Sequence, residues 1–443
     1  MAIKLSDHFS YSRLFRFVFP SIIMMVFTSI YGIVDGFFVS NFAGNTAFAS
    51  VNFTLPFLMG LSAIGFMVGA GGSALVAMRL GEGNEKKAKQ TFSLLVYLVI
   101  IVGLVLAIIG QVVLEPVIRL LGASEDMVDL CVIYGRINLC SLPFFMLQNM
   151  FQSFLVTAEK PKLGLGITIT AGITNMVLDA VLVGFFNFGI VGAGVATAIS
   201  ETLGGLIPLL YFVFPNKSRL SLVKAPVDFR SIGKACSNGA SEFMSNLSMS
   251  LVNMLYNIQL MRFAGEDGIS AYGVIMYVNF VFVSIYLGYS IGVAPVIGYN
   301  YGAQKNSELK NIFKKSLIVI AVFAIAMEIL AQSLSGFFAN IFVGYDEGLY
   351  NITHHAFTLF SLSFLFMGFN IFGSAFFTAL NNGKISATIS FGRSLVFQVI
   401  MIFLLPVFLG LDGIWLSAMV AEGLSLIITS VFLLTNRKKY KYL

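Results

Sequence analysis

Charged side chains are scarce in this sequence. Asp, Glu, Lys and Arg make up 11% of its 443 residues, against about 25% in a typical soluble domain. There are three cysteines, with no spacing typical of a disulfide framework or a zinc site. Of the three histidines, His354 and His355 are adjacent, so on a helix they point about 100° apart and make a poor metal pair. The sequence therefore offers no histidine-based or cysteine-based catalytic or metal centre, and we do not expect an enzyme.

Hydrophobic residues are abundant: they form 58% of the chain, and its mean hydropathy is +0.89. This composition predicts an all-α polytopic membrane protein in contact with the lipid bilayer. Nucleic acid is not an expected partner, because the net charge of +6 is spread over short loops. Twelve apolar stretches are long enough to be transmembrane helices: 14–40, 53–78, 91–113, 130–158, 163–186, 191–214, 235–261, 270–297, 316–338, 353–379, 385–408 and 414–435.

The basic residues are distributed unevenly between the two sides of these spans. With the N-terminus inside, and with Arg16 at the inner end of the first span counted with the N-terminal tail, 23 of the 27 Lys and Arg residues fall in inner segments and two in outer loops. Arg136 and Arg393 lie within spans. By the positive-inside rule, this bias predicts that both termini are cytoplasmic. The predicted regions are an N-terminal tail (1–13), a first lobe (14–214), a linker (215–234), a second lobe (235–435) and a C-terminal tail (436–443).

The two halves of the sequence repeat each other at a constant offset of 221 positions. Matching residues include Phe42-Ala43-Gly44 with Phe263-Ala264-Gly265, Gly71 with Gly292, Asn149 with Asn370, Gly189 with Gly410, and Glu201 with Glu422. Each half has six spans, an even number, so both halves begin on the same side of the membrane. The sequence therefore predicts two parallel six-helix repeats, an arrangement common in transporters.

Polar residues gather at a similar depth in spans one, five and six. Asn175 and Asp179 are four residues apart and share one helix face. With Asp35 and Thr197, and with Tyr31 nearby, they lie roughly 9–17 Å below the outer end of their spans at about 1.5 Å per residue. Carboxylate, amide and hydroxyl oxygens suit H⁺ or Na⁺, and two nearby carboxylates disfavour double ionisation. The alternative is an Asp that only hydrogen-bonds neighbouring helices.

The repeat separates this cluster from the other intramembrane charges. Its counterparts in the second half are Tyr256, Val396, Ile400 and Ala418, so the polar function is expected only in the first half. Glu201 and Glu422 do repeat, and for them we favour a structural or gating role. Roles for Glu328 and Arg393 remain open, and Arg136 either counters an acid or extends to the outer surface. Glu242 lies near the inner end of span seven.

Several stretches resemble the multidrug and toxic compound extrusion (MATE) family. They are residues 30–39 (IYGIVDGFFV), residues 175–179 (NMVLD) with 189–200 (GIVGAGVATAIS), and residues 410–417 (GLDGIWLS). The similarity covers essentially the whole chain and is best to the DinF-type bacterial branch, which includes MepA-like drug exporters. It implies two six-helix lobes around a central cleft and export of amphipathic or cationic drugs, driven by H⁺ or Na⁺, from a bacterial cell.

The resemblance also implies roles for individual residues. The coupling site maps onto Asp35, Asn175, Asp179 and Thr197, with Tyr31 beside it, and these residues are the expected H⁺ or Na⁺ ligands. Pro20 matches a proline whose bending of the first helix is linked to coupling. The substrate cavity maps onto Gln148, Asn149 and Gln152, together with Met25 and Thr28. The NorM-type branch places acids on helices seven and ten. Here Glu242 is the only acid on helix seven and helix ten has none, which favours the first-lobe mechanism.

Two other functional classes stay open at this point. A lipid-linked oligosaccharide flippase of the same superfamily would carry a strongly cationic central cavity, whereas this chain has two intramembrane arginines. A membrane enzyme would need a His, Ser or Asp constellation at one depth. We expect small-molecule drugs or organic cations as substrates, no cofactor beyond the coupling ion, and function as a monomer.

Overall fold

The computed structural model describes residues 3–344 and 346–443, and within them the regular structure is helical. The first half forms α1 (Tyr11–Phe38), η1 (Val39–Ala43), α2 (Asn45–Gly81), α3 (Glu85–Leu120), α4 (Glu125–Thr157), α5 (Pro161–Leu178), η2 (Asp179–Phe185) and α6 (Gly189–Val213). The second half forms α7 (Phe229–Gly302), α8 (Asn306–Val343), α9 (Glu347–Ser361), α10 (Phe364–Ala379), α11 (Gly383–Phe391), η3 (Gly392–Val396), α12 (Phe397–Leu409) and α13 (Leu411–Tyr440). The three η segments are π-helical turns.

Most of these helices are long and apolar enough to cross a membrane. In the described residues ten helices meet this condition singly, and α9 with α10 meets it as a pair bent by 45°. The 74-residue α7 is two helices joined at Gly265, whose φ of 63° breaks the helical path. The predicted all-α polytopic class is confirmed. The span expected over 353–379 is not one straight helix, because it breaks between α9 and α10 at residues 362 and 363.

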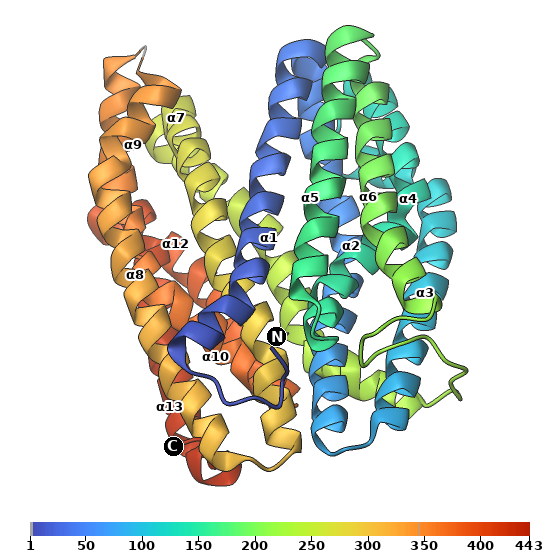
Figure 1. Ribbon diagram of the computed structural model, residues 1–443. Coiled ribbons are helices and arrows are strands. Elements are labelled where there is room, and N and C mark those ends of the chain that lie inside the picture. The colour runs from blue at the N-terminus through green and yellow to red at the C-terminus, as the bar shows by residue number, and fades with distance from the viewer. Residues whose placement is uncertain (1–2, 345) are drawn as a thin grey trace.

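The helices form two bundles, one from each half of the chain (Figure 1). The backbone repeats with the sequence at the offset of 221 residues. Gly44 and Gly265 both have positive φ, at 93° and 63°, and so do Gly189 and Gly410, at 53° and 58°. A positive φ strains residues with a Cβ, so glycine at both members of each pair lets the two bundles make the same turns.

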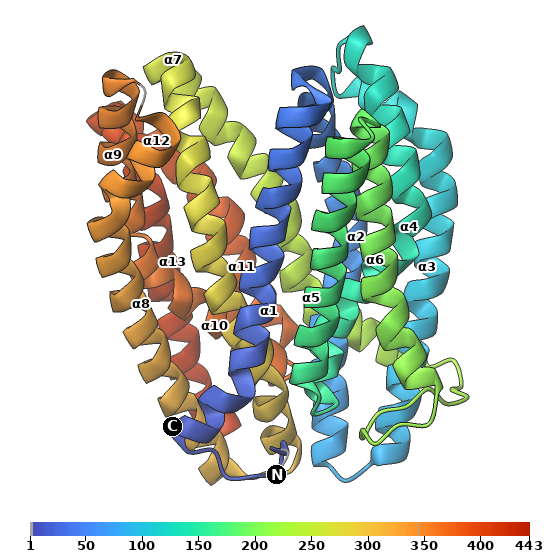
Figure 2. The same ribbon diagram turned by 45° about the horizontal axis from the view of Figure 1, so that its top comes forward.

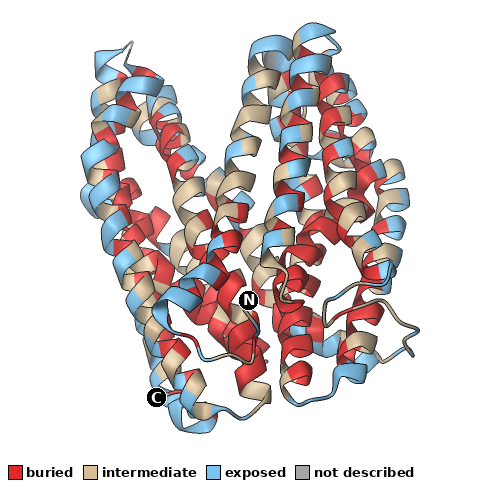
Figure 3. Ribbon diagram, in the orientation of Figure 1, coloured by how far each residue is buried: buried red, intermediate tan, exposed pale blue. Residues whose placement is uncertain are grey.

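The two bundles meet mainly toward the end of the molecule that carries both termini and diverge away from it (Figures 1 and 2). Glycines bring backbones together at this meeting point. A Cβ on Gly71 would overlap the backbone of Ala235 and Gly239 in α7, and one on Gly302 would overlap the backbone of Met78 in α2. Buried residues concentrate in the same region (Figure 3). We call this glycine-mediated contact between α2 and α7 the terminal-end seam.

The segment before α1 crosses this end and bonds to both bundles. The backbone N–H of Leu5 donates to Glu159 Oε1 over 2.9 Å, next to the start of α5. The backbone N–H of Phe9 donates to Glu308 Oε1 over 2.9 Å, and His8 Nδ1 lies 2.7 Å from Glu308 Oε2. Lys315 Nζ donates to the Phe9 carbonyl over 2.6 Å. Residues 3–9 thus form a strap that joins the start of α5, in the first bundle, to α8, in the second bundle.

Glu308 should hold this strap in a pH-dependent way. Burial alone would raise the pKa of Glu308, but hydrogen bonds involving the Phe9 N–H, His8 and Asn311 hold its pKa below the ordinary value. A carboxylate with a lowered folded-state pKa stabilises the folded state at pH values above its unfolded pKa, and that contribution is lost as pH falls through the lowered pKa.

We expect Glu308→Gln to increase hydrogen exchange of residues 3–9 at pH 7 several-fold. Glu347→Gln, an exposed acid at the start of α9, is the control and should leave that exchange unchanged. Equal exchange in both variants would contradict the strap contact.

Candidate functional site

Two acidic side chains of the first bundle meet where helices change their winding. Asp35 lies on the last turn of α1, directly before the π-helical turn η1. Asp179 begins the π-helical turn η2, one helical turn after Asn175 at the end of α5. The side chains of Asp35, Asn175 and Asp179 lie close together, and no hydrogen bond joins the two carboxyl groups within the described part of the chain. Such π-helical turns are rare and often mark functional sites.

The oxygen atoms of this cluster are buried and lack partners. Asp179 is fully buried and Asn175 is 2% exposed, whereas Asp35 and Thr197 are half-buried. Five side-chain oxygens of these four residues have no hydrogen-bond partner among the described residues. Two deprotonated carboxylates cannot donate to each other, so the pair needs a proton or a cation between them. Unpartnered buried polar atoms are costly and call for such an explanation.

The four residues of the cluster offer oxygen atoms to an ion. In the described part of the chain, no group of three or more His, Cys, Asp or Glu side chains is arranged to hold a metal ion. Two carboxylates with an amide and a hydroxyl provide oxygen ligands of the kind that hard cations prefer. No ion pair joins Asp35 or Asp179 to a basic side chain within residues 3–344 and 346–443. We call Asp35, Asn175, Asp179 and Thr197 the acid cluster.

Helix α4 contributes residues that sequence reasoning missed. Tyr134 is 1% exposed and lies beside Thr197 and near both acids of the cluster. Ser141 Oγ donates to Glu201 Oε2 over 2.6 Å. Tyr134, Ser141 and Gln148 follow one stripe of α4 at helical spacing. Tyr31 of α1 lies near Gln148 and Glu201. This stripe of polar residues in an apolar span could have indicated, from the sequence alone, that α4 borders the site.

The residues expected to bind substrate only partly share a cavity. Gln148 and Gln152 line a small cavity of about 10 Å³ with Met24, a volume suited to about one water molecule. Met25, Thr28 and Asn149 do not line this cavity; the Thr28 hydroxyl donates to the Met24 carbonyl over 2.9 Å. The structure therefore brings the two glutamines to one cavity, and the other three residues are not part of its lining.

Pro20 lies inside α1 without ending it. Proline removes one backbone hydrogen bond and favours a bend. Directly after it, the backbone of Ser21 and Ile22 is contacted by Gly288 of α7, where a Cβ would overlap both residues. The first turns of α1 thus lean on the second bundle, while Asp35 at the other end of α1 belongs to the acid cluster of the first bundle.

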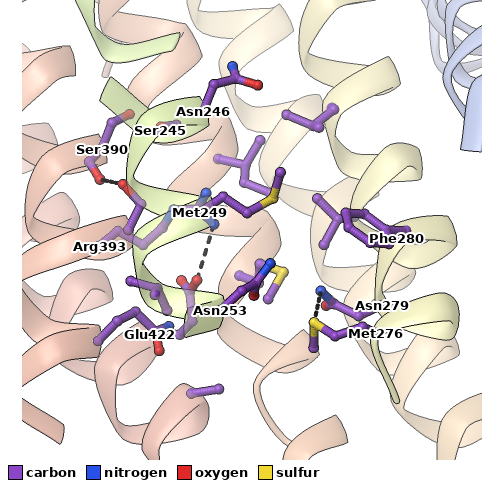
Figure 4. Close-up of a pocket in the computed structure, with 18 of the residues that line it drawn as sticks. Ser245, Asn246, Met249, Asn253, Met276, Asn279, Phe280, Ser390, Arg393 and Glu422 are labelled. Atoms are coloured by element: carbon purple, nitrogen blue, oxygen red, sulfur yellow. Dashed lines mark hydrogen bonds and ion pairs between the residues drawn. The ribbon is translucent and has the colours of Figure 1, made fainter. Parts of the chain in front are cut away.

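The second bundle contains a larger cavity of about 230 Å³, which the sequence did not predict (Figure 4). It lies between the two parts of α7 and helices of the last part of the chain. Met249, Met276 and Phe280 give it apolar walls, and Glu242 lies on its lining. Asn246, Asn253 and Tyr256 continue the same face of α7, a polar stripe that could have indicated the cavity.

An ion pair occupies one side of this cavity. Arg393, in the π-helical turn η3, donates to Glu422 Oε1 over 3.1 Å, and Asn370 donates to Glu422 Oε2 over 2.7 Å. The Glu422 side chain is 3% exposed. Arg136, the other intramembrane arginine, is exposed on α4 and forms no ion pair with a described residue. The cavity thus combines a neutralised charge pair with the carboxylate of Glu242, which forms no ion pair with another described residue.

A family model for MatE proteins matches residues 20–181 and 243–404. Together these two stretches make up well over half of the chain, and one lies in each bundle. The chain belongs to the MatE family. The two matched stretches also agree with the internal repeat.

Individual relatives of this MatE chain cover nearly its whole length. The multidrug export protein MepA of Staphylococcus saprophyticus is 25% identical, over 96% of this chain and 94% of its own. MepA of Staphylococcus aureus is 24% identical with the same coverage. A solved structure described as the outward-facing conformation of a multidrug resistance MATE family transporter has a TM-score of 0.93 and 20% identity, covering 99% of this chain and 98% of that one. The similarity to that structure establishes the two-lobed fold, and we therefore call the two bundles the first and second lobe.

The buried ion pair of the second lobe should stabilise this MatE chain measurably. Arg393→Met leaves the Glu422 carboxylate buried without its cation, a change that typically costs about 3–5 kcal/mol. We expect a lower melting temperature for Arg393→Met than for Arg393→Met/Glu422→Gln, measured on purified protein in detergent. Arg136→Met removes an exposed, unpaired arginine and should change stability by less than about 0.5 kcal/mol. Equal melting of the wild type and Arg393→Met would show that the ion pair contributes nothing, and equal melting of the single and double variants would show that the unpaired carboxylate costs nothing.

Proposed function

We propose that this protein is a secondary active exporter of amphipathic or cationic drugs, driven by the inward flow of H⁺ or Na⁺. The observation that carries this proposal is the acid cluster, in which two carboxylates lie together in a membrane-spanning bundle without a basic partner among the described residues. Acidic residues at membrane depth typically mark proton or ion pathways. An ion that shuttles across the membrane needs a site that is stable both with and without a proton or cation.

Membership in the MatE family and the similarity to MepA multidrug exporters support the proposal that the transported cargo is a drug. The second-lobe cavity fits such cargo, because its Met and Phe side chains adapt to varied apolar shapes. The unpaired carboxylate of Glu242 can attract a positive charge. Lipid-linked oligosaccharide flipping is less suited, since Arg393 is paired with Glu422 and Arg136 is exposed. We propose no chemical step, hence no enzymatic activity.

We infer that both termini lie in the cytoplasm of a bacterial cell and that the protein works as a monomer. The uneven distribution of Lys and Arg supports this orientation. With that orientation, the terminal-end seam closes the cytoplasmic side while the lobes diverge toward the outside (Figure 2). Export then alternates between this state and one in which the seam opens.

In this scheme the ion and the drug bind with different affinity to the two states. A ligand shifts such an equilibrium only by its differential affinity. A tenfold shift needs about 1.4 kcal/mol, which one gained or lost charge contact in the acid cluster can supply. Because α1 carries Asp35 and also leans on the second lobe near Pro20, it is the element through which the acid cluster would affect the lobes.

The test is export of ethidium, measured as efflux from cells or as uptake into inverted vesicles, with a pH gradient and a Na⁺ gradient imposed separately. Efflux driven by one gradient and abolished by its collapse would support antiport and identify the ion. If a folded, membrane-inserted protein moves no dye with either gradient, the proposal of drug antiport fails.

A further inference from the structure

A basic cavity of about 410 Å³ lies between the start of α1 and the start of α5, at the end of the molecule that carries the termini. Its basic side chains are Arg16 of α1 and Lys160 and Lys162, which flank the first residue of α5. None of these three side chains forms an ion pair or a hydrogen bond with a described residue. Three close positive charges without an anion repel one another, so the cavity favours a negatively charged ligand.

The acid on the cavity lining does not neutralise these charges, because it is already engaged. Glu159 Oε1 accepts the backbone N–H of Leu5 over 2.9 Å and lies 3.6 Å from Arg219. The carboxylate therefore serves the strap and an arginine of the linker between the lobes. Arg16, Lys160 and Lys162 retain their positive charges on the other sides of the cavity.

The second lobe shows that these charges are not a general feature of the fold. At the offset of 221 residues, Arg16, Lys160 and Lys162 correspond to Ser237, Asn381 and Gly383, all uncharged. The second lobe carries its inner basic residues at other positions, such as Lys234 and Lys384, so the placement of three of them on one cavity lining belongs to the first lobe. The repeat therefore separates a built basic site in the first lobe from the ordinary basic residues of inner loops.

The equivalent space in the second lobe is also closed. A Cβ on Gly383 would overlap the backbone of Ser237 and Asn238, so the starts of α7 and α11 touch. In the first lobe the start of α1 instead leans on α7 through Val18, which Gly292 contacts closely. That lean leaves the cavity between α1 and α5.

Apolar side chains on the cavity lining, and exposed ones on the same turns of α1, point to a membrane lipid. Phe15 and Phe19 flank Arg16 on α1, are each 44% exposed, and have ring centroids 5.4 Å apart. Phe17, Pro20 and Leu163 line the cavity itself. A ligand with both a negative phosphate and an acyl chain would contact the basic and the apolar surfaces together. A free phosphate would use only the first of them.

We propose that this cavity binds the phosphate of an anionic phospholipid, with Arg16, Lys160 and Lys162 around the phosphate and the acyl chains along Phe15 and Phe19. Basic pockets at the ends of membrane helices are known to hold anionic headgroups. A bound lipid would join the first turns of α1, before Pro20, to the start of α5. The proposal requires only that the site lies at the membrane surface, so it is independent of the drug and of the direction of transport.

The experiment compares retention of phosphatidylglycerol and phosphatidylcholine by purified full-length protein, using native mass spectrometry. Each basic residue near an anionic surface contributes about 1 kcal/mol, a factor of about five in affinity. We expect Arg16→Gln/Lys160→Gln/Lys162→Gln to reduce phosphatidylglycerol retention by a factor of about 100 and to leave phosphatidylcholine retention unchanged. The conservative variant Arg16→Lys/Lys160→Arg/Lys162→Arg should retain the lipid.

The matched control is Lys310→Gln/Lys314→Gln/Lys384→Gln, which removes three exposed basic residues without ion pairs from the second lobe. An equal loss in this control, or unchanged retention in the Arg16/Lys160/Lys162 variant, would overturn the proposal. Competition by inorganic phosphate alone, at concentrations that match the lipid, would show that the acyl contact is absent and would also overturn it. Because no transport is measured, a failure here is distinct from a failure of drug antiport.

Discussion

Asp179→Asn is expected to abolish gradient-driven efflux of ethidium while the protein still reaches the membrane. Asn preserves size and hydrogen bonding but cannot carry the charge that the acid cluster exchanges with H⁺ or Na⁺. A hydrogen bond or contact to a charged group is worth up to about 3 kcal/mol, so its loss should lower coupled transport about a hundredfold. The measurement is the initial rate of dye efflux under the gradient that drives the wild type.

The control for this prediction is Asp412→Asn. Asp412 lies at the start of α13, half-exposed, with His355 Nε2 at 2.9 Å. The Asp412→Asn substitution removes one negative charge from the surface and should leave the rate of efflux within about twofold of wild type. Asp35→Asn should behave like Asp179→Asn, since the two carboxyl groups lie close together in the acid cluster. Full export by the Asp179 variant would remove the acid cluster from the mechanism.

Gly71→Leu should open the terminal-end seam and reduce the rate of export at least tenfold. The backbone of Ala235 and Gly239 occupies the space that a side chain on Gly71 would need. Overpacking of this kind typically costs about 1–3 kcal/mol, and here the cost falls on the state with a closed seam. A shift of 1.4 kcal/mol already changes the ratio of closed to open states tenfold.

The native Cys236 reports the state of the seam, because it is half-buried directly after Ala235. In a Cys131→Ser/Cys140→Ser background, we expect Gly71→Leu to accelerate alkylation of Cys236 by a membrane-permeant maleimide. The matched control is Gly233→Leu in the same helix, because a Cβ there meets no atom within 4 Å. Unchanged alkylation and efflux in Gly71→Leu would mean that the seam tolerates a side chain and does not limit the cycle.

The sequence predicted the helical architecture because apolar runs and a 221-residue repeat are visible without tertiary contacts. Equal depth in their spans also placed Asp35 and Asp179 in one layer, and the structure brings them together. The pairing of Arg393 with Glu422 was not predictable, since it depends on how α13 lies against η3. The break between α9 and α10 has no proline or glycine at residues 362 and 363 to mark it.

The local winding of the helices was also beyond sequence reasoning. Nothing in residues 39–43 or 179–185 distinguishes a π-helical turn from an α-helix by hydropathy. Tyr134 escaped notice because a tyrosine in an apolar span is usually a packing residue. Its position beside the acid cluster follows from the rotation of α4, which only the packed structure defines.

The strap has a consequence for how the chain is made. Residues 3–9 leave the ribosome about 300 residues before Asn300, Glu308 and Lys315, the partners that hold them. At roughly 5–20 residues per second, the strap waits on the order of tens of seconds for these partners in the second lobe. The first segment to be synthesised is thus among the last to reach its final position. The time at which it becomes protected from protease would mark the assembly of both lobes.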